Sequence, residues 1–204
     1  MTEDPADAQD MDNEGGGQVP KLKDDYNSIG RAKTGSTDVW LTPDYILKWV
    51  HKEFGFVGLD AAADVDNAVA VYYIDEDMDA LKMPWVSDDV VWCNPPYGRQ
   101  AKKFVERAID QVEKKNCSKV VMLLAVRTDT KMFQELIFPK ASRVHFIMGR
   151  VKFKRAGKTK PNERPNFASA IVVFADPLPD RKIRLGSKDT TSFLAPYITY
   201  GPVV

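Results

Sequence analysis

Four consecutive residues, Asn94-Pro95-Pro96-Tyr97, combine hydrogen-bond acceptors with an aromatic ring. Proline fixes its own φ and keeps the preceding residue out of the helical region, so this segment is predicted to be extended. Since neither proline has an N–H, the Asn94 side chain and the Pro95 carbonyl are the groups offered to a ligand. Acceptors beside a ring suit an exocyclic NH2 group on a flat base stacked on Tyr97. The alternative is a turn that only ends a strand.

The tetrapeptide follows an apolar run at residues 90–93, which is predicted to be a buried strand of a parallel sheet. Other strands are expected at residues 56–59, 71–74, 120–125, 144–148 and 170–174, and helices at residues 43–54, 99–115 and 132–138. Thr42 is predicted to cap the first helix and Pro43 to be its first residue. Strands that alternate with helices imply an α/β fold with a doubly wound, mostly parallel sheet and a ligand crevice at the carboxyl ends of its strands.

Composition indicates one modest domain with tails. The chain has 204 residues, 44% of them hydrophobic, and a formal net charge of zero. Residues 1–36 are predicted to be a disordered acidic arm, residues 37–178 the domain, and residues 179–204 a C-terminal extension, either packed or frayed. Two cysteines make no disulfide framework, and no signal pattern or long apolar span is visible, so a soluble cytoplasmic protein without membrane contact is expected. No metal is expected, because the histidines are isolated.

Acidic residues approach the ends of the predicted strands. Asp60 follows one strand and Asp79 lies beyond the next, so both should converge with Asn94 on one crevice. Three alanines, residues 61–63, follow Asp60 and let the backbone approach a ligand closely. For each acid, the alternative is a solvated loop charge or a helix cap.

The order of these motifs resembles that of the phage-type DNA N6-adenine methyltransferases. The resemblance covers about residues 38–175 and includes Thr42-Pro43, residues 58–67, residues 79–85 and residues 149–153. It implies a Rossmann-like fold of the class I type, S-adenosylmethionine as the cofactor, and methyl transfer to N6 of a flipped-out adenine in DNA. The alanines at residues 61–63 stand where the family usually has a glycine-rich loop.

The resemblance also assigns roles to residues. The catalytic residues that it implies are Asn94, Pro95, Pro96 and Tyr97. The cofactor-binding residues that it implies are Thr42, Pro43, Asp60, Ala61, Asp64, Asn67, Asp79, Ala80 and Asn94. In this assignment Thr42 and Pro43 close over the methionine end. Asp60 suits the methionine ammonium, and Asp79 accepts from the adenine amine. Asp64 and Asn67 bond either the ribose or their own loop.

A basic segment with interleaved aromatic residues is the predicted contact with double-stranded DNA. Its residues are Arg150, Lys152, Phe153, Lys154, Arg155, Lys158, Lys160, Arg164 and Phe167. A base flipped out of the duplex needs phosphate contacts and a stacking wall, which such a loop supplies. The alternative is a solubilising surface hairpin. Arg127, beyond the strand at 120–125, contacts either a phosphate or a neighbouring carboxylate.

Other functions remain open at this stage. An acceptor pair beside a ring also suits adenine in RNA and the amide of a protein glutamine, and a non-catalytic module that binds S-adenosylmethionine or nucleic acid is a further possibility. The resemblance implies a phage or prophage gene and a host-cell location, with protection from restriction as one purpose. The recognition sequence and the oligomeric state are not determined by these residues.

Overall fold

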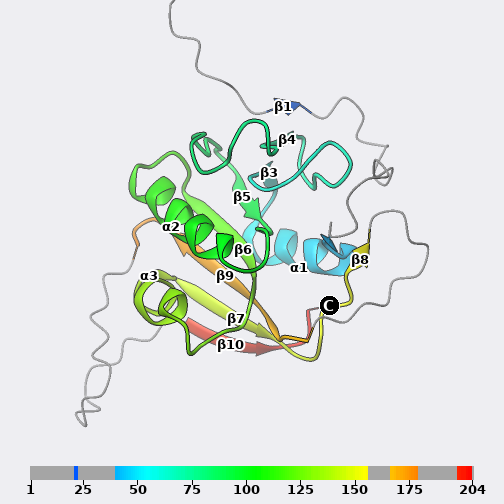
Figure 1. The fold of residues 1–204 in the computed structure, drawn as a ribbon, viewed down its shortest axis with the longest axis vertical. Coiled ribbons are helices and arrows are strands. Elements are labelled where there is room, and N and C mark those ends of the chain that lie inside the picture. The colour runs from blue at the N-terminus through cyan, green and yellow to red at the C-terminus, as the bar shows by residue number, and fades with distance from the viewer. Residues whose placement is uncertain (1–20, 23–39, 156–165, 179–196, 204) are drawn as a thin grey trace, which may run out of the picture.

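A computed structural model describes residues 21–22, 40–155, 166–178 and 197–203. This part of the chain forms an eight-stranded sheet with the order β1-β4-β3-β5-β6-β9-β7-β10, and a small second sheet of β2 and β8 (Figure 1). The strands are β1 (Lys21–Leu22), β2 (Trp40–Leu41), β3 (Val57–Asp60), β4 (Tyr72–Tyr73), β5 (Val90–Cys93), β6 (Lys119–Ala125), β7 (Arg143–Ile147), β8 (Lys154–Arg155), β9 (Ser169–Ala175) and β10 (Tyr197–Gly201). The helices are α1 (Asp44–Phe54), α2 (Gln100–Glu113), η1 (Met132–Ile137) and α3 (Phe138–Lys140).

The large sheet is mixed. Strand β3 pairs in parallel with both β4 and β5, β5 pairs in parallel with β6, and β7 with β10. Strand β9 runs antiparallel between β6 and β7, and β1 runs antiparallel beside β4. The chain moves from β3 to β4 on one side and then to β5 on the other, so the strand order reverses at β3. The ends of β3 and β5 are therefore neighbours, and the Ala61 N–H donates to the Trp92 carbonyl at 2.9 Å.

Helices cover both faces of the sheet, which explains why the central strands are apolar on both sides. Because side chains alternate along a strand, Val91 and Cys93 point to the face packed by α2 and η1, where Phe104 and Phe133 lie. Trp92 points to the other face, which is packed by α1. The protein is thus a mixed α/β structure, as the alternation of elements predicted.

The start of α1 differs from the prediction. Thr42 does not cap the helix, and Pro43 is the N-cap residue, with φ −66° and ψ 142°, so the helix begins at Asp44. The Thr42 hydroxyl is instead within hydrogen-bond distance of Asn94. At the other end, Gly55 has a φ of 104°, a conformation that glycine adopts without steric cost and that stops the helix.

The predicted core elements are confirmed within about two residues, but strands β1, β2, β8 and β10 and their pairings were not foreseen. Strand β10 pairs with β7 along its whole length, so the described residues of the C-terminal extension are packed, not frayed. Strand β1, inside the acidic arm that was predicted to be disordered, pairs with β4. The remainder of the arm, residues 1–20 and 23–36, lies outside the described residues. None of the helices in the described ranges has the length and apolar character needed to span a bilayer.

Candidate active site

The tetrapeptide forms the connection between β5 and α2, at the edge of the sheet where β3 and β5 end. Asn94 is half-buried, Pro95 is buried and Pro96 is exposed. Gly98 has a φ of 95°, so the chain turns into α2 at a position where a side chain would be strained. The tight turn holds the tetrapeptide between two well-packed elements, which fixes the positions of its hydrogen-bond acceptors.

Thr42 and Asn94 meet at this edge. The Asn94 amide nitrogen donates to the Thr42 hydroxyl oxygen at 3.4 Å, although the two residues are 52 positions apart. Pro43, which follows, is buried. The structure therefore brings the predicted Thr42-Pro43 segment against the tetrapeptide. With its NH2 group directed at Thr42, the Asn94 amide has its oxygen to offer as an acceptor.

Tyr97 lies between two other aromatic rings. The Phe167 ring is 4.9 Å from the Tyr97 ring, between centroids, at an interplanar angle of 55°, and the Phe153 ring is 6.1 Å away at 78°. Phe153 is 1% exposed and Phe167 half-buried. Burial raises the pKa of the Tyr97 hydroxyl above its usual range, so the phenol is neutral. Its oxygen has no hydrogen-bond partner among the described residues. The three rings thus form an aromatic surface, in which the buried Phe153 ring packs against the Tyr97 ring.

A cleft of about 470 Å³ opens beside the tetrapeptide, next to α2. It is lined by Ala62, Ala63, Asp64, Ile74, Asp75, Glu76, Asp79, Ala80, Leu81, Pro96, Gln100 and Phe104. Predicted cofactor residues from two separate segments, Asp64 from one and Asp79 and Ala80 from the other, therefore lie on one cavity with Pro96. Carboxylates beside apolar walls in a cavity of this size are typical of a small-molecule site.

Asp60 supports the wall of this cleft without lining it. The side chain is 3% exposed, and its two carboxylate oxygens accept the backbone N–H groups of Ala62 and Val69 at 3.2 and 3.1 Å. Ala61 is fully buried beneath the loop. The Asp60 carboxylate thus closes the loop that follows β3. A loop of alanines without glycine keeps its shape through these bonds.

Asp64 and Asn67 bond each other within the next turn. The Asp64 carboxylate accepts the N–H groups of Asp66 and Asn67 at 2.8 and 3.1 Å, and the Asn67 side-chain oxygen accepts the Asp64 N–H at 2.8 Å. Two roles were left open for this pair, hydrogen bonds to the ribose or to their own loop. The structure shows the hydrogen bonds to the loop. Asp64 also lines the cleft, whereas Asn67 does not.

Asp79 adopts a backbone conformation that is rare for residues other than glycine, with a φ of 55°. Its carboxylate accepts the Leu81 N–H at 3.1 Å and pairs with the Lys82 ammonium at 2.9 Å. The hydrogen bond from Lys82 holds the pKa of Asp79 below its usual value, so the side chain is an ionised acceptor. It is 40% exposed and remains accessible from the cleft.

Asp75, Glu76, Gln100 and Phe104 line the cleft and were missed by the sequence analysis. Asp75 and Glu76 lie two and three residues beyond the end of β4, and an acid near a strand end is a recognisable signal for a ribose partner. Gln100 and Phe104 lie on the first turns of α2, and nothing in their spacing distinguishes them from ordinary helix positions.

The predicted DNA-binding residues are only partly described. Arg127, Arg150 and Lys152 are exposed, and Arg127 lies after β6 at the same sheet edge as Asn94. The backbone of Lys154–Arg155 forms β8 and pairs with Trp40–Leu41. Phe153 is in the core and Phe167 beside Tyr97, as described above. The remaining predicted residues, Lys158, Lys160 and Arg164, lie outside the described residues.

One residue of a nucleophilic type, Cys93, lies next to the tetrapeptide. Cys93 is fully buried directly before Asn94, and desolvation raises the pKa of its thiol well above the usual value, so it is not a nucleophile. Within the described ranges, no three His, Cys, Asp or Glu side chains are grouped as metal ligands would be. The side chains at the tetrapeptide are acceptors and a neutral phenol. They suit the binding and orientation of an amine.

Comparison with known proteins identifies the family. Residues 30–193 match the family described as DNA N-6-adenine-methyltransferase (Dam), and the chain belongs to this family. It is also similar to a DNA N-6-adenine-methyltransferase of Escherichia phage T1, with 36% identity over 98 residues. That alignment covers 48% of the chain and 40% of the phage protein, so the matched part spans about two fifths of the relative's length. The family inferred from the motifs is confirmed.

Proposed function

We propose that this protein transfers a methyl group from S-adenosylmethionine to N6 of a flipped-out adenine in double-stranded DNA. The observation that carries the proposal is the position of the tetrapeptide, in which the Asn94 amide is held by Thr42 and Pro96 lines the cleft together with Asp64 and Asp79. Membership of the Dam family and the similarity to the phage T1 protein support it. The similarity also supports a phage or prophage gene whose product acts in the cytoplasm of the host, including in protection from restriction.

The cleft fits an adenosyl cofactor. Its volume of about 470 Å³ is in the range of nucleotide-sized ligands. Asp79 is assigned to the adenine amine, with Ala80 and Leu81 as apolar neighbours of the ring. Asp75 or Glu76, near the end of β4, is assigned to the ribose hydroxyls. Asp60 and Asp64 act mainly by shaping the loop that approaches the methionine end.

When bound, S-adenosylmethionine supplies a methyl group that is already activated by its sulfonium. The work left to the protein is to align and polarise the amine. The Asn94 side-chain oxygen and the Pro95 carbonyl accept the two amine hydrogens, which directs the nitrogen lone pair toward the cleft and stabilises positive charge that grows on the nitrogen. No general base is needed for the attack. Pro96 lines the cleft, so the tetrapeptide borders the substrate on one side and the cofactor on the other.

Tyr97 is assigned to stacking on the flipped base. Phe167 extends the aromatic surface and the buried Phe153 supports Tyr97 from the core. Arg127, Arg150 and Lys152 are exposed, and we assign them to the phosphates that flank the extruded nucleotide. The reversal of strand order at β3, with helices on both faces of the sheet, supports a doubly wound, Rossmann-like fold of the class I type.

The proposal is tested by incubating the protein with labelled S-adenosylmethionine and double-stranded DNA, followed by digestion to nucleosides and mass identification. N6-methyladenine is the expected product. Asn94→Ala should lower the rate by about 100-fold or more, in line with the loss of a charge-stabilising group. Lys48→Ala, on the exposed side of α1, is the control and should retain the parent rate. Labelled RNA or protein with unlabelled DNA would contradict the adenine-in-DNA assignment.

A further inference from the structure

The segment from Asp79 to Trp85 forms part of the cleft lining. Hydrogen bonds made by Trp85 hold the far end of this segment in place. The Trp85 ring is fully buried, and its indole N–H donates to the Ala80 carbonyl at 2.9 Å. The Trp85 backbone N–H donates to the side-chain oxygen of Gln111, on α2, at 2.8 Å. The segment is therefore folded back on itself and tied to α2 at its far end.

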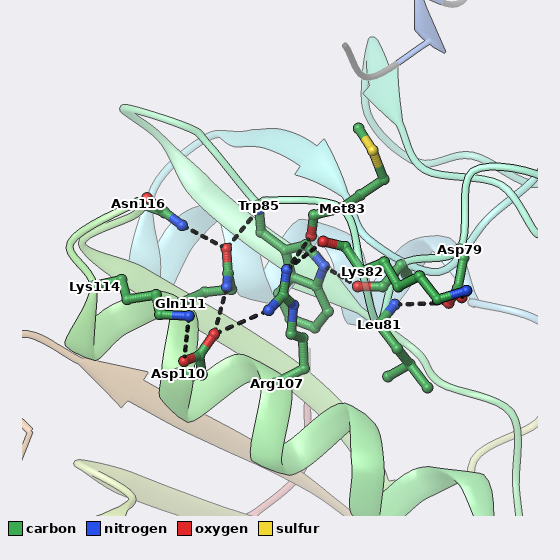
Figure 2. A network of polar contacts seen from close by, with 11 residues as sticks. Asp79, Leu81, Lys82, Met83, Trp85, Arg107, Asp110, Gln111, Lys114 and Asn116 are labelled. Atoms are coloured by element: carbon green, nitrogen blue, oxygen red, sulfur yellow. Dashed lines mark hydrogen bonds and ion pairs between the residues drawn. The ribbon is translucent and has the colours of Figure 1, made fainter. Parts of the chain in front are cut away.

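Arg107, one turn before Gln111, secures the middle of the same segment. Its Nη2 atom donates to the carbonyls of Lys82 and Met83 at 2.8 and 2.7 Å (Figure 2). These two carbonyls directly follow the residues that line the cleft, and one guanidinium nitrogen joins them. A planar guanidinium with fixed donor directions is suited to hold such a pair of acceptors, which a lysine ammonium is not.

Asp110 orients both of these side chains. It accepts from Arg107 Nη1 at 3.0 Å and from Gln111 Nε2 at 2.8 Å, and it pairs with the Lys114 ammonium at 2.9 Å (Figure 2). Because Arg107 Nη1 donates to the Asp110 carboxylate, the guanidinium is oriented with Nη2 directed at the two carbonyls. Asp110 and Gln111 lie three and four residues after Arg107 on one helix, so the geometry of the three side chains is fixed by α2 itself.

Helix α2 also borders the reaction site. It begins three residues after Tyr97, and Gln100 and Phe104 on its first turns line the cleft. One rigid helix thus connects the tetrapeptide to the Asp79–Trp85 segment. The position of the Asp79 carboxylate relative to Asn94 depends on how firmly that segment is held to α2.

We propose that Arg107 is a positioning residue for cofactor recognition: by binding the Lys82 and Met83 carbonyls it holds the Asp79 carboxylate where it accepts from the 6-amino group of the cofactor's adenine. This inference rests on the proposed function, because it presumes an adenosyl ligand in the cleft. Arg107 does not line the cleft, and its effect passes through the backbone of residues 79–83.

Asp79 requires such support. Its φ of 55° is an unfavourable conformation for a residue with a side chain, and the turn it begins is closed by the Lys82 and Met83 N–H groups, which donate to the Asp79 carbonyl at 2.8 and 3.0 Å. Arg107 binds the carbonyls of the same two residues. Without the guanidinium, this turn is free to relax toward an ordinary conformation, and the carboxylate then moves away from its place on the cleft wall.

The test uses direct binding to the full chain. Affinities are measured for S-adenosylhomocysteine and for its analogue with hydrogen in place of the adenine 6-amino group. The parent is expected to prefer the amino compound by about tenfold, the value of one hydrogen bond to a charged acceptor. In Arg107→Met and in Arg107→Lys that preference is expected to fall below about threefold, because both variants lose the paired contact with the carbonyls.

Lys103→Met is the matched control, since Lys103 is exposed on the same helix and should leave the preference unchanged. Loss of folded structure alone lowers the amount of binding protein but not the preference of the folded fraction for one ligand, and Arg107→Lys preserves the charge if Arg107→Met does not fold. A parent that binds neither compound contradicts the proposed function. A parent that prefers the amino compound, with both Arg107 variants showing the same preference, overturns the role of Arg107.

Discussion

The Asn94 side-chain amide donates to the Thr42 hydroxyl oxygen at 3.4 Å and thereby joins the tetrapeptide to the chain segment that enters α1. An amide has an acceptor and a donor that are similar in shape, and only the acceptor suits an incoming amine. A partner for the NH2 group therefore fixes the orientation of the amide and the direction in which its oxygen points. This contact links a residue before α1 to the tetrapeptide that follows β5.

Thr42→Val is expected to lower the rate of methyl transfer about tenfold, because the substitution keeps the side-chain shape and removes the hydrogen bond that orients Asn94. The affinity for S-adenosylmethionine should change little. Thr42→Ser, which retains the hydroxyl, should keep most of the rate. Single-turnover kinetics at saturating cofactor, beside direct cofactor binding, provide the measurement. A normal rate with weakened cofactor binding would assign Thr42 to the methionine end, as the family resemblance implies.

Tyr97→Phe is expected to keep the transfer rate within about twofold and to raise the free energy of unfolding by up to about 1 kcal/mol, because a buried hydroxyl without a partner among the described residues is unfavourable. Tyr97→Ala should lower the rate about tenfold or more through loss of base stacking. Denaturant unfolding and transfer assays on the two variants provide the comparison. An inactive Tyr97→Phe would show that the hydroxyl contacts the substrate.

The local sequence pattern was sufficient to predict the secondary-structure elements that position the site. Strand β5 was predicted with its observed limits, because four apolar residues lie between a pair of aspartates and a Pro-Pro break. The position of the tetrapeptide followed from it. Strand β4 was expected over residues 71–74 and has two residues, and Asp75 and Glu76 beyond its end were not among the predicted site residues. A two-residue strand that forms by pairing with its neighbour is too short to show a recognisable sequence pattern.

Contacts between distant segments were not predictable from the sequence. Strand β10 pairs with β7 across more than fifty positions, and a parallel pairing leaves no local signal in either strand. In the sequence, Arg107 cannot be distinguished from the other charged residues on the polar side of an amphipathic helix. In the structure it binds backbone carbonyls, and because every residue has a carbonyl, the sequence does not indicate such a partner. Asp60 is the last residue of β3, within one residue of the predicted strand end. The sequence did not show that its carboxylate turns inward to the loop N–H groups.

Gly58→Ala is expected to destabilise the protein by about 1–3 kcal/mol, because β3 passes close to the 87–89 segment. A Cβ at residue 58 would lie 2.8 Å from the Ser87 hydroxyl oxygen and 2.9 Å from the Asp89 Cβ. Ser87→Ala removes only the first of these contacts, so the double variant should recover part of the loss. The free energy of unfolding is measured for both single variants and the double variant. Unchanged stability of Gly58→Ala would contradict this close approach.

His145 should make stability depend on pH. Its ring packs 4.7 Å from the Trp49 ring, its Nδ1 atom is 2.6 Å from the Thr199 hydroxyl oxygen, and burial lowers its pKa below the usual 6.5. The unfolded chain therefore binds the proton first, and the free energy of unfolding is expected to fall as the pH decreases below 6.5 until the folded-state pKa is reached. Urea unfolding between about pH 7.5 and about pH 5.5 tests this. His145→Gln should weaken the dependence and the exposed His51→Gln should retain it. An equal dependence in both variants would exclude His145 as its source.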